Sequence, residues 1–434
     1  MRLDQPCFSL VALSLGLLWL RVADAATITA ASCSQSDVQS AITSAKSGDI
    51  VNLPGPCSPT WSSGAGVGGA LLIPNSKGIT LNGGGNVTLA ASPSIDVELN
   101  ATASSRVTGF TFTGGGTDNY GDLVVCASGS CSSDLAPFRV DNNTFTSPTG
   151  AVFVAVWGLP TGLIDHNTLT AGPAAEMIHN MGLGNANQVG WTNAVTPGSP
   201  YMVYIESNTF INSSPNSTNL KCIESYYGAE TVVRYNTLQY NVAVDQHGTA
   251  GQVGARWWEF YGNTFVAGGY RMTAFAALRG GSGVFFNNHL SGSYSDGSPG
   301  VSLYEEDSGY PACFQVGRGY DPVGNCTDTG NTPNAGNSEW LSPAYLWGND
   351  SAIQSTIASG SSNVVSGRDY YASITQPSPM MKCQSSLDSG TTTSCSTAYD
   401  YAPFTYPYPL DANGMPNPAG EAVLPPTSLS ATAH

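Results

Sequence analysis

A degenerate six-residue pattern recurs through the middle of this 434-residue chain. A typical copy has an apolar residue, an outward-facing residue, a variable residue, an asparagine, a threonine and a second apolar residue. The asparagines of six copies lie 24, 41, 28, 27 and 25 residues apart in turn: Asn143, Asn167, Asn208, Asn236, Asn263 and Asn288, with Asn349 a weaker candidate. Such periods, with short strands and turn residues, are typical of a solenoid whose repeats stack on one another. The sequence therefore predicts a β-solenoid.

An asparagine ladder is the expected consequence of this repeat. Strands of stacked coils lie about 4.8 Å apart, so an asparagine at the same bend of every coil can hydrogen-bond up and down the stack. Glycine is abundant, with 50 residues, and only 10% of residues are charged, which favours a β-rich fold with many tight turns. The repeat resembles that of the pectate-lyase-like superfamily, which includes exported bacterial proteins. The resemblance implies an all-β fold, a single-stranded right-handed parallel β-helix of about ten coils.

The two ends of the chain differ from the repeat region. The segment Met1 to Ala25 has a basic start, a short apolar stretch and small residues at its end, which is typical of a secretory signal peptide. Ser36 to Lys46 is predicted as one short helix that caps the open end of the solenoid. Residues 411–434, rich in Pro, Ala, Ser and Thr, predict a flexible tail. We therefore expect a secreted protein, extracellular or periplasmic, with one β-helix domain over residues 26–410 and no membrane span.

Cysteine spacing agrees with export. Outside the signal segment, eight of the nine cysteines fall into local couples, which in an exported protein suggest disulfides that pin loops. The couples are Cys33/Cys57, Cys126/Cys131, Cys313/Cys326 and Cys383/Cys395. Cys222 remains, and its apolar strand pattern predicts a buried small residue rather than a nucleophile.

Alternation along the strands places two columns of side chains on the outside of the predicted coils. The first column holds the residue two places before each asparagine, and the second holds the residue four places before it. The first reads Asp141, Asp165, Glu206, Arg234, Tyr261 and Phe286, and the second reads Arg139, Leu163, Tyr204, Val232, Glu259 and Val284. Acids, an arginine and a tyrosine on one face predict a groove for an extended polymer.

The charge distribution points to the same part of the chain. The net charge is −16, but the segment from Lys221 to Arg279 has five basic and four acidic residues, a local balance of +1. Lys221 lies 15 residues before Asn236, and His247 lies 16 before Asn263, which predicts similar positions on adjacent coils. Local positive charge in an acidic chain is what an acidic polysaccharide would require. We therefore expect these cations to meet the first column on coils four to six.

Two reactions suit such a groove. In β-elimination on a uronic-acid polymer, a cation or Ca²⁺ neutralises the sugar carboxylate, a base removes the C5 proton and an acid protonates the leaving oxygen. In hydrolysis, two carboxylates flank the scissile bond about 5 to 9.5 Å apart, and Glu206 with Asp165 is the candidate pair. Ile164-Asp165-His166 is similar to part of the pectate-lyase Trp-Ile-Asp-His motif, although the repeat alone produces the same letters. The chain lacks the Arg-x-Pro-x-x-Arg stretch of pectate lyases and the Asp-Asp pair of polygalacturonases, so neither catalytic set is carried over.

Polysaccharide lyase is the leading predicted activity, glycoside hydrolase the second, and a non-catalytic carbohydrate-binding or surface scaffold the third. The predicted catalytic residues are Arg234, His247, Lys221 and Arg256. The predicted substrate-binding residues are Tyr261, Glu206, Arg279, Glu259 and Asp165. Structural ion pairs are the alternative for two of these side chains, Arg256 with Glu259 and Lys221 with Glu224. The site is expected to be centred on Arg234.

The predicted partner is an acidic polysaccharide rather than a nucleic acid, and the chain is expected to be a monomer. No residue is assigned to a metal, and the cofactor is left open with Ca²⁺ as the candidate that β-elimination can use. The acidic run Glu305-Glu306-Asp307 is a candidate segment for such an ion, with a solvated loop as the alternative.

Overall fold

The computed structural model describes most of the chain from Ala25 to Leu410, with gaps. The described residues are 25–62, 69–90, 95–114, 121–129, 131–148, 152–172, 176–182, 195–213, 221–239, 242–247, 254–267, 274–293, 300–304, 316–320, 340–362, 364–383 and 395–410. The predicted signal peptide apart from Ala25, the tail 411–434, the couple Cys313/Cys326 and the acidic run 305–307 lie outside this set.

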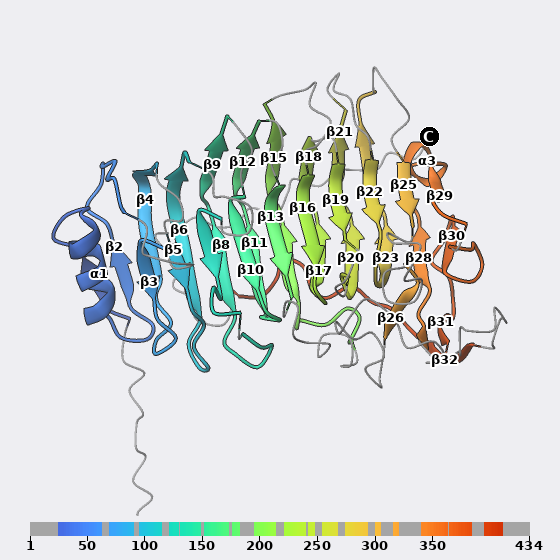
Figure 1. The fold of residues 1–434 in the computed structure, drawn as a ribbon, viewed down its shortest axis with the longest axis horizontal. Coiled ribbons are helices and arrows are strands. Elements are labelled where there is room, and N and C mark those ends of the chain that lie inside the picture. The colour runs from blue at the N-terminus through green and yellow to red at the C-terminus, as the bar shows by residue number, and fades with distance from the viewer. Residues whose placement is uncertain are drawn as a thin grey trace, which may run out of the picture.

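Parallel strands stack along one axis in two long sheets (Figure 1), which confirms the predicted parallel β-helix. The ten-stranded sheet supports the expected number of coils and consists of β3 (Leu71–Ile73), β5 (Ile95–Val97), β7 (Leu123–Val125), β10 (Val154–Trp157), β13 (Glu176–Met181), β16 (Lys221–Tyr226), β19 (Val242–Gln246), β22 (Ala274–Leu278), β25 (Gly300–Leu303) and β29 (Ile357–Ser359).

The eighteen-stranded sheet receives two strands from most coils, joined at the asparagine bend. Its strands are β1 (Thr27–Thr29), β2 (Ile50–Asn52), β4 (Thr80–Leu89), β6 (Ser105–Phe112), β8 (Phe138–Asp141), β9 (Thr144–Ser147), β11 (Gly162–Asp165), β12 (Thr168–Ala171), β14 (Val203–Glu206), β15 (Thr209–Asn212), β17 (Glu230–Arg234), β18 (Thr237–Gln239), β20 (Trp257–Tyr261), β21 (Thr264–Val266), β23 (Ser282–Phe286), β24 (His289–Ser291), β28 (Ala344–Trp347) and β30 (Tyr370–Ser373).

The asparagine ladder is present and continuous. In each rung, one Oδ1 accepts from the backbone N–H and the Nδ2 of the asparagine on the coil before, as Asn167 Oδ1 does from Asn143 at 2.9 and 3.2 Å. The ladder ends at Asn349, whose Oδ1 accepts from Asn288, so the weaker candidate belongs to it. The residue before each asparagine takes a positive φ, which turns the chain sharply between the two strands. These residues are Asn142, His166, Ser207, Tyr235, Gly262, Asn287 and Gly348.

A helix covers one end of the stack, as predicted. Helix α1 (Gln35–Ser44) follows the N-cap Ser34 and buries Val38, Ala41 and Ile42 on the core. It begins one residue earlier and ends two residues earlier than predicted. Lys77 Nζ donates to the carbonyls of Ile42, Thr43 and Ala45, which caps the C-terminal end of the helix. A second short helix, α3 (Ser351–Gln354), follows β28.

Two of the predicted disulfides are formed, Cys33–Cys57 and Cys126–Cys131, and Cys222 is a buried free cysteine as expected. The backbones of Cys383 and Cys395 pair across the hairpin of β31 (Met380–Cys383) and β32 (Cys395–Tyr399), but their side chains lie outside the described part. Strands β26 (Arg318–Tyr320) and β27 (Trp340–Leu341) form a further antiparallel pair. Among the described residues, no helix is both long and apolar enough to cross a membrane.

The last described residues do not form another coil. Residues 395–410, here called the C-terminal segment, run back along the outside of the eighteen-stranded sheet toward the middle of the stack (Figure 1). Tyr401 packs edge-on against Trp347 of β28, whereas Tyr408 packs on Tyr204 of β14, four coils earlier in the stack. This segment therefore covers the face on which the sequence predicts a groove.

Candidate functional site

The first outward column forms in the predicted register. Neighbouring strands pair Asp141 with Asp165, Asp165 with Glu206, and so on through Arg234 and Tyr261. The column is nevertheless closed, because the C-terminal segment lies over it. Arg234 and Glu206 are 0% and 1% exposed. The expectation that this column forms an open groove centred on Arg234 is therefore wrong.

Arg234 joins the coils to the C-terminal segment. Its Nε donates to Glu206 Oε2 at 2.6 Å, and its Nη1 donates to the Tyr261 hydroxyl at 2.9 Å. The same guanidinium donates to the backbone carbonyls of Phe404 and Thr405 at 2.7 and 2.9 Å. Burial alone would lower the pKa of Arg234, but the Glu206 charge and the Tyr261 contact raise it. This geometry is that of a structural clamp.

The other acids of this face are also held by protein donors. Asp165 accepts from Arg139 on the coil before it, at 3.0 and 2.8 Å. Glu259 accepts from Gly198 N–H, the Trp257 indole and the Tyr401 hydroxyl, although burial still raises its pKa. Glu206 and Asp165, the predicted hydrolase pair, are thus both buried in ion pairs and face no open space.

Arg256, another predicted catalytic cation, is buried. It precedes β20, is 2% exposed, and its charge acts on Glu230 at the start of β17. Burial raises the pKa of Glu230 to about 7, against the lowering effect of Arg256. Glu230 and Asn180 line a cavity of about 260 Å³ beside the turn 158–160.

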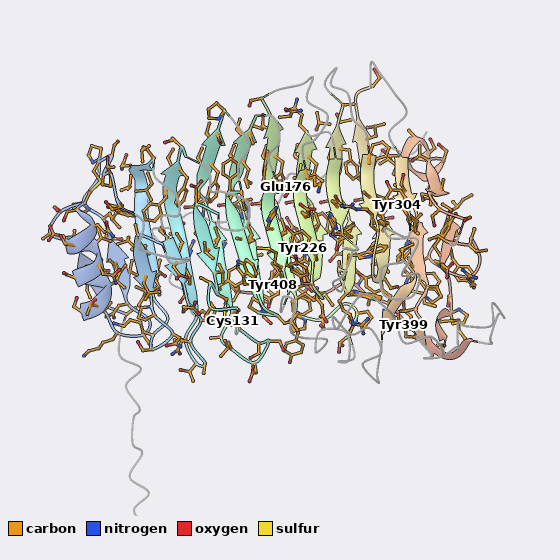
Figure 2. All side chains as sticks on the ribbon, in the orientation of Figure 1. Cys131, Glu176, Tyr226, Tyr304, Tyr399 and Tyr408 are labelled. Atoms are coloured by element: carbon orange, nitrogen blue, oxygen red, sulfur yellow. A yellow bond between two sulfur atoms is a disulfide. The ribbon has the colours of Figure 1, made fainter. Side chains whose placement is uncertain are left out.

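The remaining predicted side chains gather on the outer face of the ten-stranded sheet. We call the group the charged cluster; its members are Glu176, His179, Lys221, Glu224, Asp245, His247 and Arg279. Glu176 and Tyr226 mark its place on the middle strands, and Tyr408 marks the C-terminal segment (Figure 2). Lys221, His247 and Arg279 are therefore brought together, but on a different sheet from Arg234. The prediction that these cations meet the first column is therefore wrong.

Lys221 occupies the centre of the charged cluster. Its Nζ lies 2.6 Å from Glu224 Oε1, 3.1 Å from Glu176 Oε1 and 3.1 Å from Asp245 Oδ2. Burial would lower the pKa of Lys221, but the three carboxylates around it raise the value. The side chain keeps 16% of its surface exposed, so a polymer lying on this face can reach it.

His247 and Arg279 complete the cationic side of the cluster. His247 Nε2 lies 3.4 Å from Glu224 Oε1, and Arg279 makes a two-pronged contact with Asp245 at 2.8 and 2.5 Å. Their side chains are 20% and 18% exposed. Together with Lys221 they form a partly open strip of positive and ionisable groups.

Lys221 and His247 lie on adjacent coils as predicted, but not at similar positions along the strands. The register pairs Lys221 with Val242, so His247 lies five residues further on. Counting back from the asparagines fails because Val242 is 263 − 242 = 21 residues before Asn263, whereas Lys221 is 15 before Asn236. The connection between strand and bend is longer in the second coil.

Glu176, His179 and Asp245 were not predicted as site residues from the sequence. Glu224 was predicted only as the alternative ion-pair partner of Lys221, and that ion pair is present. Aligning the strands themselves would have found these residues, because β13 begins Glu-Met-Ile-His, β16 begins Lys-Cys-Ile-Glu and β19 begins Val-Ala-Val-Asp. The fourth residue of each tetrad shares one row across the sheet, His179 with Glu224 and Glu224 with Asp245. The signal is therefore a polar residue that follows two apolar residues at the same position of successive strands in the ten-stranded sheet.

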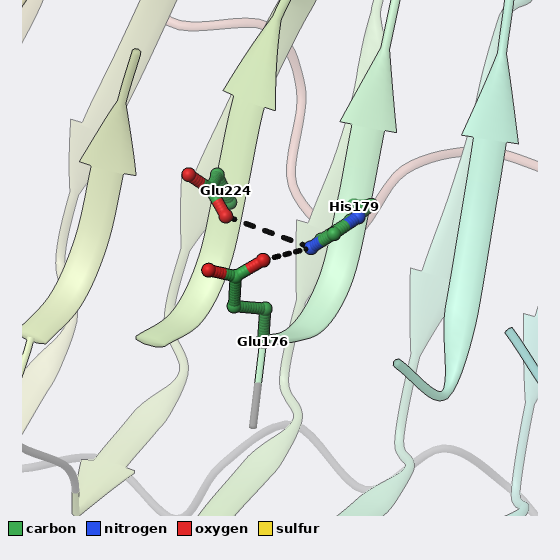
Figure 3. A group of neighbouring side chains, drawn as sticks. All are labelled: Glu176, His179 and Glu224. Atoms are coloured by element: carbon green, nitrogen blue, oxygen red, sulfur yellow. Dashed lines mark hydrogen bonds and ion pairs between the residues drawn. The ribbon is translucent and has the colours of Figure 1, made fainter. Parts of the chain in front are cut away.

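Glu176 and Glu224 share one end of the cluster with His179 (Figure 3). His179 Nε2 lies 2.7 Å from Glu176 Oε2 and 3.6 Å from Glu224 Oε2. Burial and a hydrogen bond to Glu176 raise the pKa of Glu224 well above its usual range. Burial acts in the same direction on Glu176, but His179, Glu224 and the charge of Lys221 lower its pKa. Glu224 therefore binds a proton more tightly than Glu176 does.

Ca²⁺, the candidate cofactor that β-elimination can use, does not fit this donor set. Ca²⁺ takes six to eight oxygen ligands. Here the ammonium of Lys221 already lies between Glu176 Oε1, Glu224 Oε1 and Asp245 Oδ2, and the next donors are imidazole nitrogens. The charged cluster therefore lacks the oxygen ligands that Ca²⁺ binding requires among the described residues.

In comparisons with known proteins, no family model, no curated protein and no solved structure matches this chain.

Proposed function

We propose that this protein is an exported polysaccharide lyase of the pectate-lyase-like superfamily, which cleaves a uronic-acid polymer at the charged cluster. The observation that carries the proposal is the partly open strip of Lys221, His247 and Arg279 on one face of a solenoid. A flat stack of parallel strands offers an extended surface to a polymer. Cations on that surface attract the carboxylates of a uronate chain.

Each of the three side chains has a distinct role in β-elimination. Arg279 binds the uronate carboxylate and offsets the negative charge that develops when the C5 proton leaves. His247 accepts this proton, since imidazole exchanges protons near neutral pH. The C4–O4 bond breaks as the C4=C5 double bond forms, and Lys221 donates a proton to the leaving O4. One product carries the double bond, and the other gains a new reducing end.

Hydrolysis is the weaker alternative at the same place. One carboxyl oxygen of Glu176 and one of Glu224 lie within 4.8 Å of each other. Glycosidases hold their two carboxyl groups about 5–5.5 Å or 6.5–9.5 Å apart, so that the sugar or a water fits between them. A pair whose oxygens lie closer than this leaves no such room.

The test is incubation of the purified protein with uronate polymers while the ultraviolet absorbance of the unsaturated product is followed. His247→Ala should lower kcat/KM by at least about 100-fold, and Lys221→Met should do the same. His166→Ala is the matched control, because His166 also contacts a carboxylate but lies at the bend between β11 and β12, away from the charged cluster, and its loss should leave turnover unchanged. New reducing ends without absorbance would favour a hydrolase, and binding without turnover would favour a scaffold. Loss of activity in His166→Ala but not in His247→Ala would move the site to the other sheet.

A further inference from the structure

At one end of the charged cluster, Glu176, His179 and Glu224 each offer one metal-ligating atom, and these atoms lie within 4.8 Å of one another (Figure 3). The oxygens that pair with His179 Nε2 are Glu176 Oε2 and Glu224 Oε2. The opposite oxygens, Oε1 of both glutamates, face the ammonium of Lys221. Each glutamate therefore turns one oxygen toward Lys221 and the other toward His179.

Glu224 provides an observation independent of this clustering. Its side chain is 3% exposed, and among the described residues its Oε2 has no hydrogen-bond donor, with His179 Nε2 3.6 Å away. A buried carboxylate oxygen without a donor is costly unless a proton or a cation meets it. The atom that lacks a partner is the one aimed at the other two.

We propose that Glu176, His179 and Glu224 bind one divalent transition-metal ion of the Zn²⁺ class. Two ligands that each lie ~2.0–2.1 Å from a tetrahedral ion are about 3.3 Å apart. The measured separations from His179 Nε2, 2.7 Å to Glu176 and 3.6 Å to Glu224, lie on either side of that value. Small side-chain shifts therefore suffice to coordinate the ion.

The surroundings of His179 favour the same ion. Its other ring nitrogen, Nδ1, lies 3.3 Å from the Tyr226 hydroxyl, and the two rings meet edge to face. A metal-bound imidazole characteristically hydrogen-bonds through its second nitrogen, which fixes the ring and its tautomer. The strands β13 and β16 hold all three ligands in register, with His179 beside Glu224.

Charge and coordination number also fit. Three ionised carboxylates and the two cations Lys221 and Arg279 give the cluster a formal charge of 2 − 3 = −1 with neutral histidines, so a dication leaves +1. Three protein ligands leave a fourth coordination position open, as in catalytic rather than structural zinc sites. Glu176, whose side chain is 34% exposed, lies on the open side. The mixed nitrogen and oxygen donors separate this site from the all-oxygen coordination that Ca²⁺ requires.

The experiment measures metal binding directly. Protein without a histidine tag is stripped with a chelator, and Co²⁺ is added as a spectroscopic substitute for Zn²⁺. The expected result is a visible d–d absorption that saturates at one equivalent, survives millimolar Ca²⁺ and disappears when Zn²⁺ is added. His179→Gln and Glu224→Gln should each weaken Zn²⁺ binding at least about tenfold. His289→Gln is the matched control, because His289 pairs with a single exposed carboxylate, Asp350, and should bind as wild type does.

Several outcomes overturn the proposal. If stripped wild type takes up neither Co²⁺ nor Zn²⁺, a proton alone occupies the site. If both variants bind like wild type, the ion lies elsewhere. Glu224→Gln keeps the volume of the side chain, so it tests the site even if His179→Gln fails to fold. The inference does not rest on the lyase activity. Turnover by metal-free protein would show that the ion has no catalytic role and would leave the proposed function standing. Metal binding without turnover would support the metal site and contradict the proposed lyase activity.

Discussion

Replacing Arg234 with alanine should loosen the C-terminal segment rather than remove a catalytic group. The substitution deletes hydrogen bonds to Glu206, Tyr261 and the carbonyls of Phe404 and Thr405. It also leaves Glu206, 1% exposed, with a buried charge that has lost its cation. Breaking a buried ion pair by removing one partner costs about 3–5 kcal/mol. We expect a loss of that size in the free energy that holds the segment on the sheet.

Limited proteolysis with mass spectrometry measures this effect locally, and thermal unfolding measures it globally. Arg234→Ala should be cleaved within residues 395–410 under conditions in which wild type stays intact, and its melting temperature should fall. Lys46→Ala is the control, because Lys46 is an exposed cation next to the capping helix. It should behave as wild type does.

A double variant separates the missing charge partner from lost packing. Combining Glu206→Gln with Arg234→Met removes both charges while nearly preserving volume, so that no buried charge is left without its partner. The double variant should therefore resist protease better than Arg234→Ala. An Arg234→Ala protein with wild-type melting and protease resistance would refute the clamp. Loss of turnover in such a stable protein would return Arg234 to the active site.

Two further predictions concern the scaffold. Asn208→Ala should lower the free energy of unfolding by about 3 kcal/mol, because it removes the donor to Ile164 O, Glu206 O and Asn236 Oδ1 and the acceptor for the coil before. Asn349→Ala, at the end of the ladder, should cost less in the same denaturant titration, and equal losses would contradict the ladder account. Burial raises the pKa of Asp96 from 3.8 to about 7. The folded protein then binds the Asp96 proton more tightly than the unfolded chain does. Proton binding therefore stabilises the fold fully below about pH 4, and this contribution to the free energy of unfolding is lost as the pH rises toward 7. Asp96→Asn should therefore match wild type at pH 4 and melt at a higher temperature at pH 8, and a difference that does not vary with pH would disprove this account.

The sequence was sufficient to predict the backbone of the solenoid. The bend asparagines recur because each coil presents the same buried polar groups to the next. Asn143 and Asn288 therefore make the same hydrogen bond to the asparagine of the following coil. Side-chain alternation then fixed which residues share a column, and the column from Asp141 to Phe286 forms as predicted. Short-range disulfides and the capping helix depend on neighbouring residues and were likewise predictable.

The identity of the exposed face was decided only by the tertiary structure. Alternation shows that Arg234 points away from the core, but not that residues 404 and 405, 170 or more positions later, cover it. The position of Lys221 relative to His247 depended on the length of a connection between coils, which the spacing of the asparagines does not reveal. Glu176, His179 and Glu224 meet because strands far apart in sequence are aligned by backbone pairing across the sheet. The sequence by itself thus determined the repeating local structure of each coil, whereas long-range packing decided which charges are sealed as structural clamps and which remain open to chemistry.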